Sequence, residues 1–222
     1  MTPAPLLDEE VKMEFDFEAI DAKQRYKLLG AAITPRPIAW VSTLGERGEL
    51  NAAPFSFFNA FGEDPPVLGF SILHRSDTDR KDTGENVRRE REFVVNLVGE
   101  ANLDDMNVTA IDFPPDRSEF IEAGLVAAPS TRIRTPRIAH SPVSFECRLF
   151  DIVPLGPSRS LVLGEVLTMH IADAAVIDAQ KAYIDARRLH LIGRGEPNTY
   201  VRTNDVIRLP AIALQNWTGQ PV

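Results

Sequence analysis

Residues 38–60 read IAWVSTL, GERGE and LNAAPFSFFNA in succession, and this stretch decides the fold class. The apolar run from Ile38 to Leu44 is typical of a strand. The glycine-containing segment from Gly45 to Glu49 is typical of a turn, and the run from Leu50 to Ala60 predicts a second strand. The stretch is therefore expected to form a β-hairpin with a longer loop.

More strands are expected on the C-terminal side of this hairpin. They are Val67–Leu73, Phe93–Val98, Val143–Val153 and Ser160–Ile171, the last two joined by a turn at Pro154–Ser158. Strands joined by hairpins, without regular alternation with helices, disfavour a doubly wound sheet. The sequence predicts a mainly β fold with inserted helices, arranged as a mostly antiparallel barrel.

Helices are expected between these strands. The predicted ranges are Asp21–Ala32, Thr83–Glu92, Asn102–Ile111, Glu119–Ala123 and Asp178–Leu189. Asp21 and Thr83 are suitable N-caps, because their side-chain oxygens can accept from the first free N–H groups of a helix. Gly124 is expected to end the helix before it.

Length and composition indicate one main domain. The chain has 222 residues, of which 44% are hydrophobic, and a net charge of −8. We expect an N-terminal arm at residues 1–20, one domain at 21–205 and a C-terminal extension at 206–222. The densest basic run, RRERE at residues 88–92, is interleaved with acids, so no nucleic-acid partner is expected.

The start of the chain has neither the basic residues nor the apolar core of a signal peptide. No apolar run approaches the roughly 18 residues of a membrane span. The prediction is a cytoplasmic protein that does not bind a membrane.

Several common active-site motifs are absent. The GRG at residues 193–195 begins like a dinucleotide-binding turn, but Asn198 occupies the place of the third glycine. There is no phosphate-binding Walker loop and no nucleophile elbow. The four histidines are widely spaced and Cys147 is the single cysteine, so no metal site is predicted. Cys147 is interpreted as a small buried hydrophobe.

Residue types suited to a phosphate-bearing aromatic ligand gather at three places. They are the strand entry at Thr34–Thr43, the segment Asn51–Asn59 and the triplet Lys81-Asp82-Thr83. Small residues let a flat ring approach the backbone, hydroxyls suit a ribityl chain, and cations with hydroxyls hold a phosphate. A binding site for flavin mononucleotide (FMN) requires these groups.

The ordered set of motifs resembles the flavin reductase-like family with its FMN-binding split barrel. The set consists of RPIAWVST at 36–43, NAAPFSFF at 51–58, DPP at 64–66, KDT at 81–83 with Asn86, and FVVNL at 93–97. The resemblance extends over about residues 20–205 and implies a split β-barrel.

The resemblance also implies a homodimer whose bound FMN is reduced by NADH or NADPH. The electrons would pass to free flavin, a partner monooxygenase or an electron-transfer protein. The flavin itself carries the chemistry, so no catalytic side chain is predicted. The predicted cofactor-binding residues are Arg36, Trp40, Ser42, Thr43, Asn51, Ala52, Ala53, Ser56, Phe57, Lys81, Asp82, Thr83, His190 and Arg194. Glu196-Pro197 departs from the glycines expected in the loop that follows Arg194.

Alternatives remain open at the sequence level. The chain could be a flavoredoxin-like carrier without NAD(P)H turnover, or a flavin-free split-barrel binding protein. Trp40 could be a core residue, Lys81 an exposed loop residue, and Arg36 could pin the chain through a salt bridge. The sequence does not choose between NADH and NADPH, between FMN and FAD, or between tight and transient flavin binding.

Overall fold

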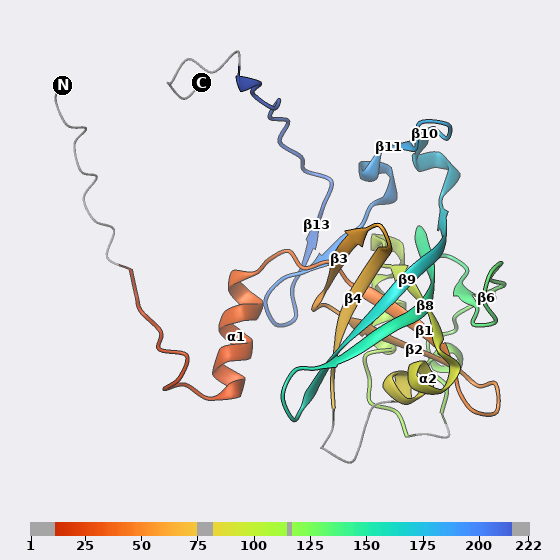
Figure 1. Ribbon diagram of the computed structural model, residues 1–222, viewed down its shortest axis with the longest axis horizontal. Helices are drawn as coiled ribbons and strands as arrows, with labels where there is room; N and C mark the ends of the chain where they lie inside the picture. Colours follow the sequence, from red (N-terminus) through yellow and green to blue (C-terminus); the bar gives the residue numbers. More distant parts are fainter. Residues whose placement is uncertain (1–11, 75–81, 115–116, 215–222) are drawn as a thin grey trace.

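The centre of the molecule is a curled, seven-stranded antiparallel sheet (Figure 1). The computed structural model describes residues 12–74, 82–114 and 117–214. In pairing order the strands are β2 (Leu50–Phe55), β1 (Ala39–Leu44), β5 (Glu92–Leu97), β8 (Val143–Pro154), β9 (Arg159–Ile171), β4 (Pro66–Leu73) and β3 (Phe58–Glu63). The predicted antiparallel, mainly β architecture is confirmed.

One strand prediction was wrong, and the arrangement that the structure has instead closes the barrel. The run from Leu50 to Ala60 forms two strands, β2 and β3, which lie at opposite edges of the sheet. Only Ser56 and Phe57 connect them, so the sheet has to curl until its edges come together. The N–H of Ser71 on β4 donates to the carbonyl of Phe57 at 2.9 Å, which fixes this link.

The sheet buries apolar side chains on both faces. Along β1, Val41 points into the cluster that contains Phe70 and Phe93, whereas Trp40 points into the cluster with Met106. Successive side chains of a strand alternate between faces, so neighbouring residues serve different cores. The second cluster is covered by α3 (Leu103–Val108), which follows η1 (Glu100–Asn102), and by α4 (Glu119–Glu122).

Two of the predicted helix ends are confirmed. Asp21 caps α1 (Ala22–Ala32): it accepts from the N–H of Gln24 at 2.7 Å, and the Gln24 side chain accepts from the Asp21 N–H in return. Gly124 follows α4 with φ +64°, a backbone conformation that suits glycine. The predicted cap at Thr83 was wrong, because α2 (Asp82–Glu90) already contains it and its hydroxyl bonds elsewhere.

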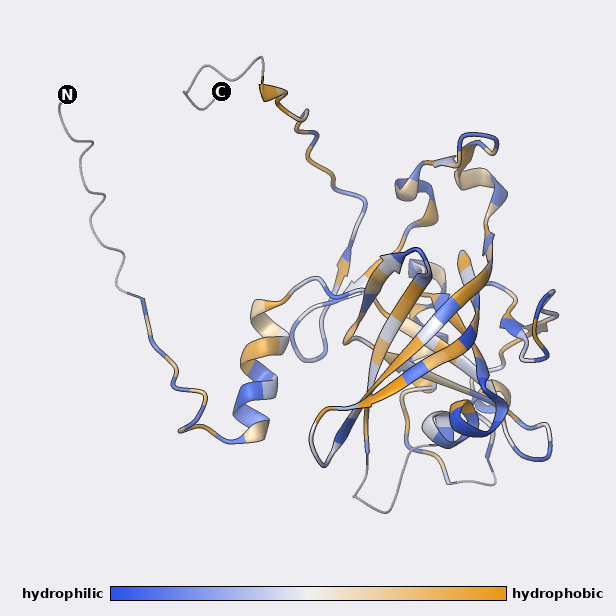
Figure 2. Cartoon of the chain, viewed as in Figure 1, coloured by the Kyte–Doolittle hydropathy of each residue, from blue (hydrophilic) through white to orange (hydrophobic). Residues whose placement is uncertain are grey.

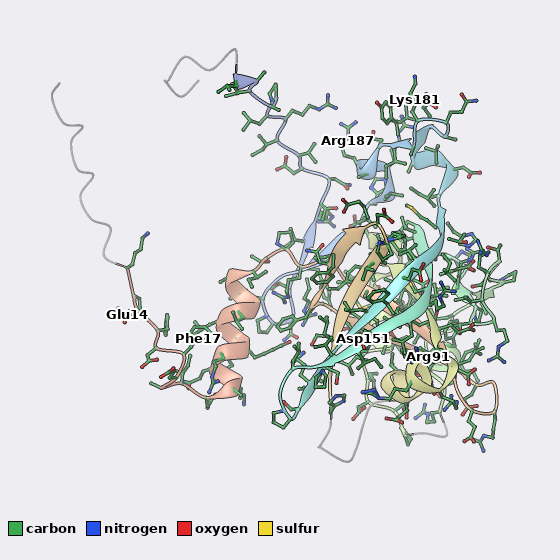
Figure 3. The ribbon with its side chains drawn as sticks, in the orientation of Figure 1. Glu14, Phe17, Arg91, Asp151, Lys181 and Arg187 are labelled. Carbon is green, nitrogen blue, oxygen red and sulfur yellow. The ribbon has the colours of Figure 1, made fainter. Side chains whose placement is uncertain are left out.

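The helix predicted at Asp178–Leu189 does not form. The chain instead folds into η2 (Asp173–Ala175), β10 (Val176–Asp178), β11 (Tyr183–Ile184) and η3 (Ala186–Leu189). The Asp178 carboxylate accepts from two following backbone N–H groups, and Asp185 accepts from the N–H of Arg187. Aspartate turns of this kind compete with helix formation. Figure 3 shows Lys181 and Arg187 on this excursion, away from the barrel.

Short strands complete the described part of the chain. β6 (Ala127–Ala128) pairs with β7 (Arg137–Ile138), and β12 (Ile192–Arg194) pairs with β13 (Tyr200–Arg202). After β13 the chain leaves the barrel as an extended tail (Figure 1). Figure 2 shows many apolar residues along this tail. No helix within the described ranges is long and apolar enough to cross a membrane.

Candidate functional site

Three cavities meet at Pro54, near the end of β2. The largest, about 600 Å³, is lined by Tyr26, Pro54, Ser56, Asn107, Arg194 and Tyr200 among others. The second, about 90 Å³, lies against Asn51, Ala53, Pro54, Asp82, Thr83 and Glu119. The third, about 230 Å³, includes Pro54, Ser56, Phe57, Ser71 and Arg159 in its lining.

The position of Pro54 explains why open space remains there. β2 is an edge strand, and Pro54 is opposite Trp40 in the β1–β2 register. Proline has no N–H to donate and is tolerated at sheet edges. The chain then turns through Ser56 and Phe57 towards β3 at the opposite edge. The cavities therefore occur where the barrel closes.

A buried polar network forms the floor of the smallest cavity. The Asn51 side-chain oxygen accepts from the hydroxyls of Thr43 at 3.2 Å and Thr83 at 3.0 Å. The Asn51 amide donates to the Glu119 carboxyl at 2.8 Å, and the Asn86 amide donates to the Thr43 hydroxyl at 3.1 Å. This network fixes the first turn of α2 and the start of α4 against the hairpin.

Burial has a consequence for the charge of Glu119. Its side chain is largely enclosed, and burial raises the pKa of its carboxyl above the ordinary value. The negative charge of Asp82, which lines the same cavity, raises the pKa of Glu119 further.

Four predicted site residues lie in the interior, behind the cavities: Trp40, Ser42, Thr43 and Ala52, each fully buried. The Trp40 indole donates to the hydroxyl of Thr109 at 2.9 Å, and the Ser42 hydroxyl donates to the carbonyl of Pro136 at 2.8 Å. These side chains support the strand and do not line any of the three cavities.

Arg36 is also used within the fold. Its guanidinium donates to the carbonyls of Gly30, Ile33 and Gly195, the last two at 2.8 Å. Its backbone pairs with that of Arg194. Burial lowers the pKa of Arg36 from its usual value. Arg36 thus joins the end of α1 to the loop after β12 through carbonyls, and it forms no salt bridge with a described residue.

The remaining predicted residues fall into three groups. Ser56 and Arg194 line the large cavity; Asn51, Ala53, Asp82 and Thr83 line the small one; Phe57 lines the third. His190 is exposed, and its Nδ1 is 3.0 Å from the side-chain nitrogen of Asn204, so it lines none of them. Lys81 lies outside the described residues.

The sequence prediction missed several lining residues. Tyr26 and Tyr200 border the large cavity, with the Arg194 guanidinium 4.7 Å from the centre of the Tyr200 ring. Asn107 comes from α3 and Arg159 from the start of β9. Tyr26 had a helical apolar spacing as its signal, whereas Arg159 follows a turn and carries no local sign of a site.

Two further observations concern metals and thiols. Among residues 12–74, 82–114 and 117–214, no group of three or more His, Cys, Asp or Glu is placed to hold a metal ion. Cys147 is fully buried, which confirms its interpretation as a small core residue, and burial raises the pKa of its thiol.

Residues 31–188 match the model of the flavin reductase like domain. This chain belongs to the flavin reductase-like family. The resemblance drawn from the motifs is therefore confirmed.

Relatives support the same assignment. An uncharacterized protein of Deinococcus radiodurans is 41% identical over 211 residues, which is 93% of this chain and 92% of that protein. The 2-nitrobenzoate 2-nitroreductase NbaA of Pseudomonas fluorescens is 33% identical with a TM-score of 0.83, over 91% of this chain and 98% of its own. Nitrilotriacetate monooxygenase component B of Bacillus cereus is 31% identical with a TM-score of 0.85, over 90% and 100%.

The split-barrel fold has a direct counterpart. A Shewanella frigidimarina protein with a split barrel domain superposes with a TM-score of 0.77 at 20% identity, over 90% of this chain and 100% of its own. At that identity the likeness shows the fold alone. The predicted split barrel is confirmed, and family membership supports an oxidoreductase that uses a flavin.

Proposed function

We propose that this flavin reductase-like protein binds FMN at the end of β2 and works as an NAD(P)H-dependent flavin reductase. The observation that carries the proposal is the 600 Å³ cavity at the barrel closure, in a chain of this family. Cytoplasmic location and a homodimeric state are part of the same proposal.

The lining of the cavity suits the parts of FMN. Pro54, Tyr26 and Tyr200 offer flat or apolar surface for a ring system, Ser56 and Asn107 offer hydrogen-bonding groups, and Arg194 offers a positive charge. Residues of the Asn51–Phe57 segment border all three cavities. The residue types present fit the group.

Charge decides which residues would hold the phosphate. Asp82 and Glu119 line the small cavity, so an anion bound near Thr83 needs a cation to offset these carboxyls. The hydroxyls of Ser56 and Thr83 together with Lys81 are the proposed ligands of the phosphate and ribityl chain. Arg194 is the proposed cation at the other side of Pro54.

A bound flavin supplies hydride acceptance and electron transfer, which no side chain of this protein needs to perform. The protein's own residues position the ring against β2 and exclude water. The buried Asn51 network and the Trp40 cluster keep that strand in place. No acid or base is assigned to the chain.

Relatives suggest where the electrons go. One similar protein is a nitroreductase and another is component B of a monooxygenase. We propose delivery to free flavin or to a partner oxygenase, as in a two-component system. The competing proposal is a flavin-bound electron carrier that does not turn over NAD(P)H.

The first test is the anaerobic visible spectrum of the purified protein, before and after FMN and then NADH are added. The proposal expects a bound-flavin spectrum that bleaches with NADH, and parallel titrations with FAD and NADPH assign the preferred cofactors. A bound flavin that NADH does not bleach, but that a reduced protein donor does, would establish the carrier. Failure to bind any flavin would refute both.

A further inference from the structure

Arg159 is a partly buried cation beside the third cavity. It lies at the start of β9, opposite Leu73 in the β4–β9 register. Its Nη1 donates to the Ser71 hydroxyl at 3.2 Å, and the guanidinium lies 5.1 Å from the centre of the Phe57 ring. Burial lowers the pKa of Arg159 from its usual value, yet a guanidinium keeps its charge at neutral pH.

This charge has no carboxylate partner within the part of the chain that the structure describes. Some other arginines there do have one: Arg148 pairs with Glu165 and Arg187 pairs with Asp185, both at 2.8 Å. A desolvated charge is costly unless an opposite charge or hydrogen bonds compensate it. Among the described side chains, the Arg159 guanidinium contacts the Ser71 hydroxyl and the face of the Phe57 ring.

Two adjoining cavities surround Arg159 and differ in character. The 230 Å³ cavity is also lined by Ser56 and by Ser71, whose hydroxyl accepts from the guanidinium. The other, about 420 Å³, is mostly apolar and includes Leu29 of α1 and Leu73. Both include Tyr26, Phe57, Leu73 and Arg159, and the rings of Tyr26 and Phe57 lie 5.8 Å apart.

We propose that Arg159 anchors a small organic anion that has a flat apolar body. The carboxylate or phosphate of the ligand would bind the guanidinium. The Ser71 hydroxyl, which accepts from Arg159, keeps its own hydrogen to donate to the same anion. The flat body would pack against Phe57 and Tyr26 and extend towards Leu73.

The site borders the cavity proposed for FMN, because Pro54, Ser56 and Tyr26 line both. If the proposed function holds, the anion is a second substrate or acceptor at the rim of the flavin. Binding of the anion does not itself require flavin, so the two proposals can fail separately.

Isothermal titration calorimetry of the full chain tests the site with four probes: benzoate, phenyl phosphate, inorganic phosphate and the neutral benzamide. Benzoate or phenyl phosphate should bind, the tighter of the two identifying the preferred anion. Benzamide should bind at least about tenfold more weakly, since it lacks the charge. Equal binding of benzamide overturns the role of Arg159, and equal binding of inorganic phosphate overturns the role of the flat body.

Variants locate the binding. Arg159→Gln should weaken benzoate binding about 10- to 100-fold. The benzoate affinity of Arg159→Lys should lie between that of Arg159→Gln and that of the wild type. Phe57→Leu should weaken benzoate binding about two- to tenfold. Arg148→Gln, which removes an exposed arginine of the same sheet, is the matched control and should bind as the wild type does. Unchanged affinity in Arg159→Gln overturns the proposal.

Repeating the benzoate titration with saturating FMN separates this site from the flavin site. The proposal expects benzoate to bind with FMN present. Complete loss of benzoate binding in the presence of FMN would place Arg159 inside the flavin site and overturn a separate anion site. Absence of FMN binding would refute the proposed function and leave the benzoate result intact. Circular dichroism of each variant checks that it is folded.

Discussion

Asn51 shows how one side chain can couple three elements. Its side-chain oxygen accepts hydrogen bonds from two threonine hydroxyls, and its amide donates to the Glu119 carboxyl. Asn51 therefore links β2 to α2 and α4. Each of these groups is buried, and a buried polar group that loses its partner costs free energy. Asn51 therefore acts in the framework of the site as much as on its surface.

Replacing Asn51 tests that role. Asn51→Leu should lower the free energy of unfolding by about 2–4 kcal/mol, because Thr83 and Glu119 lose hydrogen-bond partners in the interior. Urea denaturation measures the loss. The matched control is Asn59→Leu on the exposed part of β3, for which we expect a change within about 0.5 kcal/mol. Equal losses in the two variants would contradict the network.

Arg194 tests the proposed flavin site at a single residue. Arg194→Gln removes a positive charge from the 600 Å³ cavity and should weaken FMN binding about tenfold or more. Quenching of flavin fluorescence gives the affinity. Arg202→Gln serves as control, since this exposed arginine on the neighbouring β13 pairs with Glu100. If both variants bind FMN like the wild type, Arg194 is not a flavin ligand.

Cys147 offers a simple probe of packing. Its thiol is fully buried on β8, and burial raises the pKa of the thiol, so the reactive thiolate is disfavoured. A thiol reagent such as Ellman's should not label the native protein, and should label it once guanidinium unfolds the chain. Rapid labelling of the native state would show that the β8–β9 region opens.

At the scale of elements, Glu146 on β8 holds the loop between β6 and β7. It accepts from the N–H groups of Thr131 at 2.7 Å and Arg132 at 2.6 Å, and it contacts the ring of His170. Burial alone would raise the pKa of Glu146, but these hydrogen bonds outweigh it, and the pKa lies below the ordinary value. The charged form is the one that stabilises the fold.

A lowered carboxyl pKa fixes the direction of the pH dependence. The stabilisation from Glu146 is present above the unfolded pKa of about 4.3 and is lost as pH falls through the lower folded pKa. Glu146→Gln should lower the free energy of unfolding by about 1–3 kcal/mol at pH 7. The difference in free energy of unfolding between this variant and the wild type should narrow below about pH 4. Urea denaturation at several pH values measures it.

Glu165→Gln is the control for this prediction. Glu165 pairs with Arg148 on the exposed side of the same strands, and such surface pairs contribute about 0–1 kcal/mol. If the difference in free energy of unfolding between Glu146→Gln and the wild type stays constant from pH 7 to pH 3, the negative charge assigned to Glu146 is contradicted.

At the scale of the whole molecule, the apolar surfaces are unevenly placed. The tail beyond β13 exposes Ile207 at 95%, Leu209 at 89% and Leu214 at 89%. On α1, Tyr26 and Leu29 are also exposed. Figure 1 shows the tail and α1 outside the barrel. Exposed apolar surface of this extent favours contact with another chain, which supports the proposed homodimer.

The tail should therefore contribute to dimer formation. Ile207→Ser combined with Leu209→Ser should shift the monomer–dimer equilibrium towards monomer, because each leucine-sized side chain contributes about 1.5–3 kcal/mol when buried. Sedimentation velocity over a range of concentrations measures the shift, with Arg208→Gln as control. A full chain that is monomeric at every concentration would refute the homodimer.

The sequence by itself determined the features that depend on neighbouring residues. The N-cap at Asp21, the end of α4 at Gly124 and the long β8–β9 hairpin were all predictable, because caps and turns are set by a few adjacent side chains. The ordered motifs also identified the family. The helix predicted over Asp178–Leu189 failed because aspartate turns within it override weak helical spacing.

Tertiary structure alone decided where the strands meet and what the cavities contain. The alternation along a strand assigns side chains to two faces, but it does not show that β2 and β3 separate at Ser56 and lie at opposite edges. That separation depends on the curl of the whole sheet. The same curl brings Arg159 to Phe57 across a hundred residues of sequence, and no local pattern encodes such a distant contact.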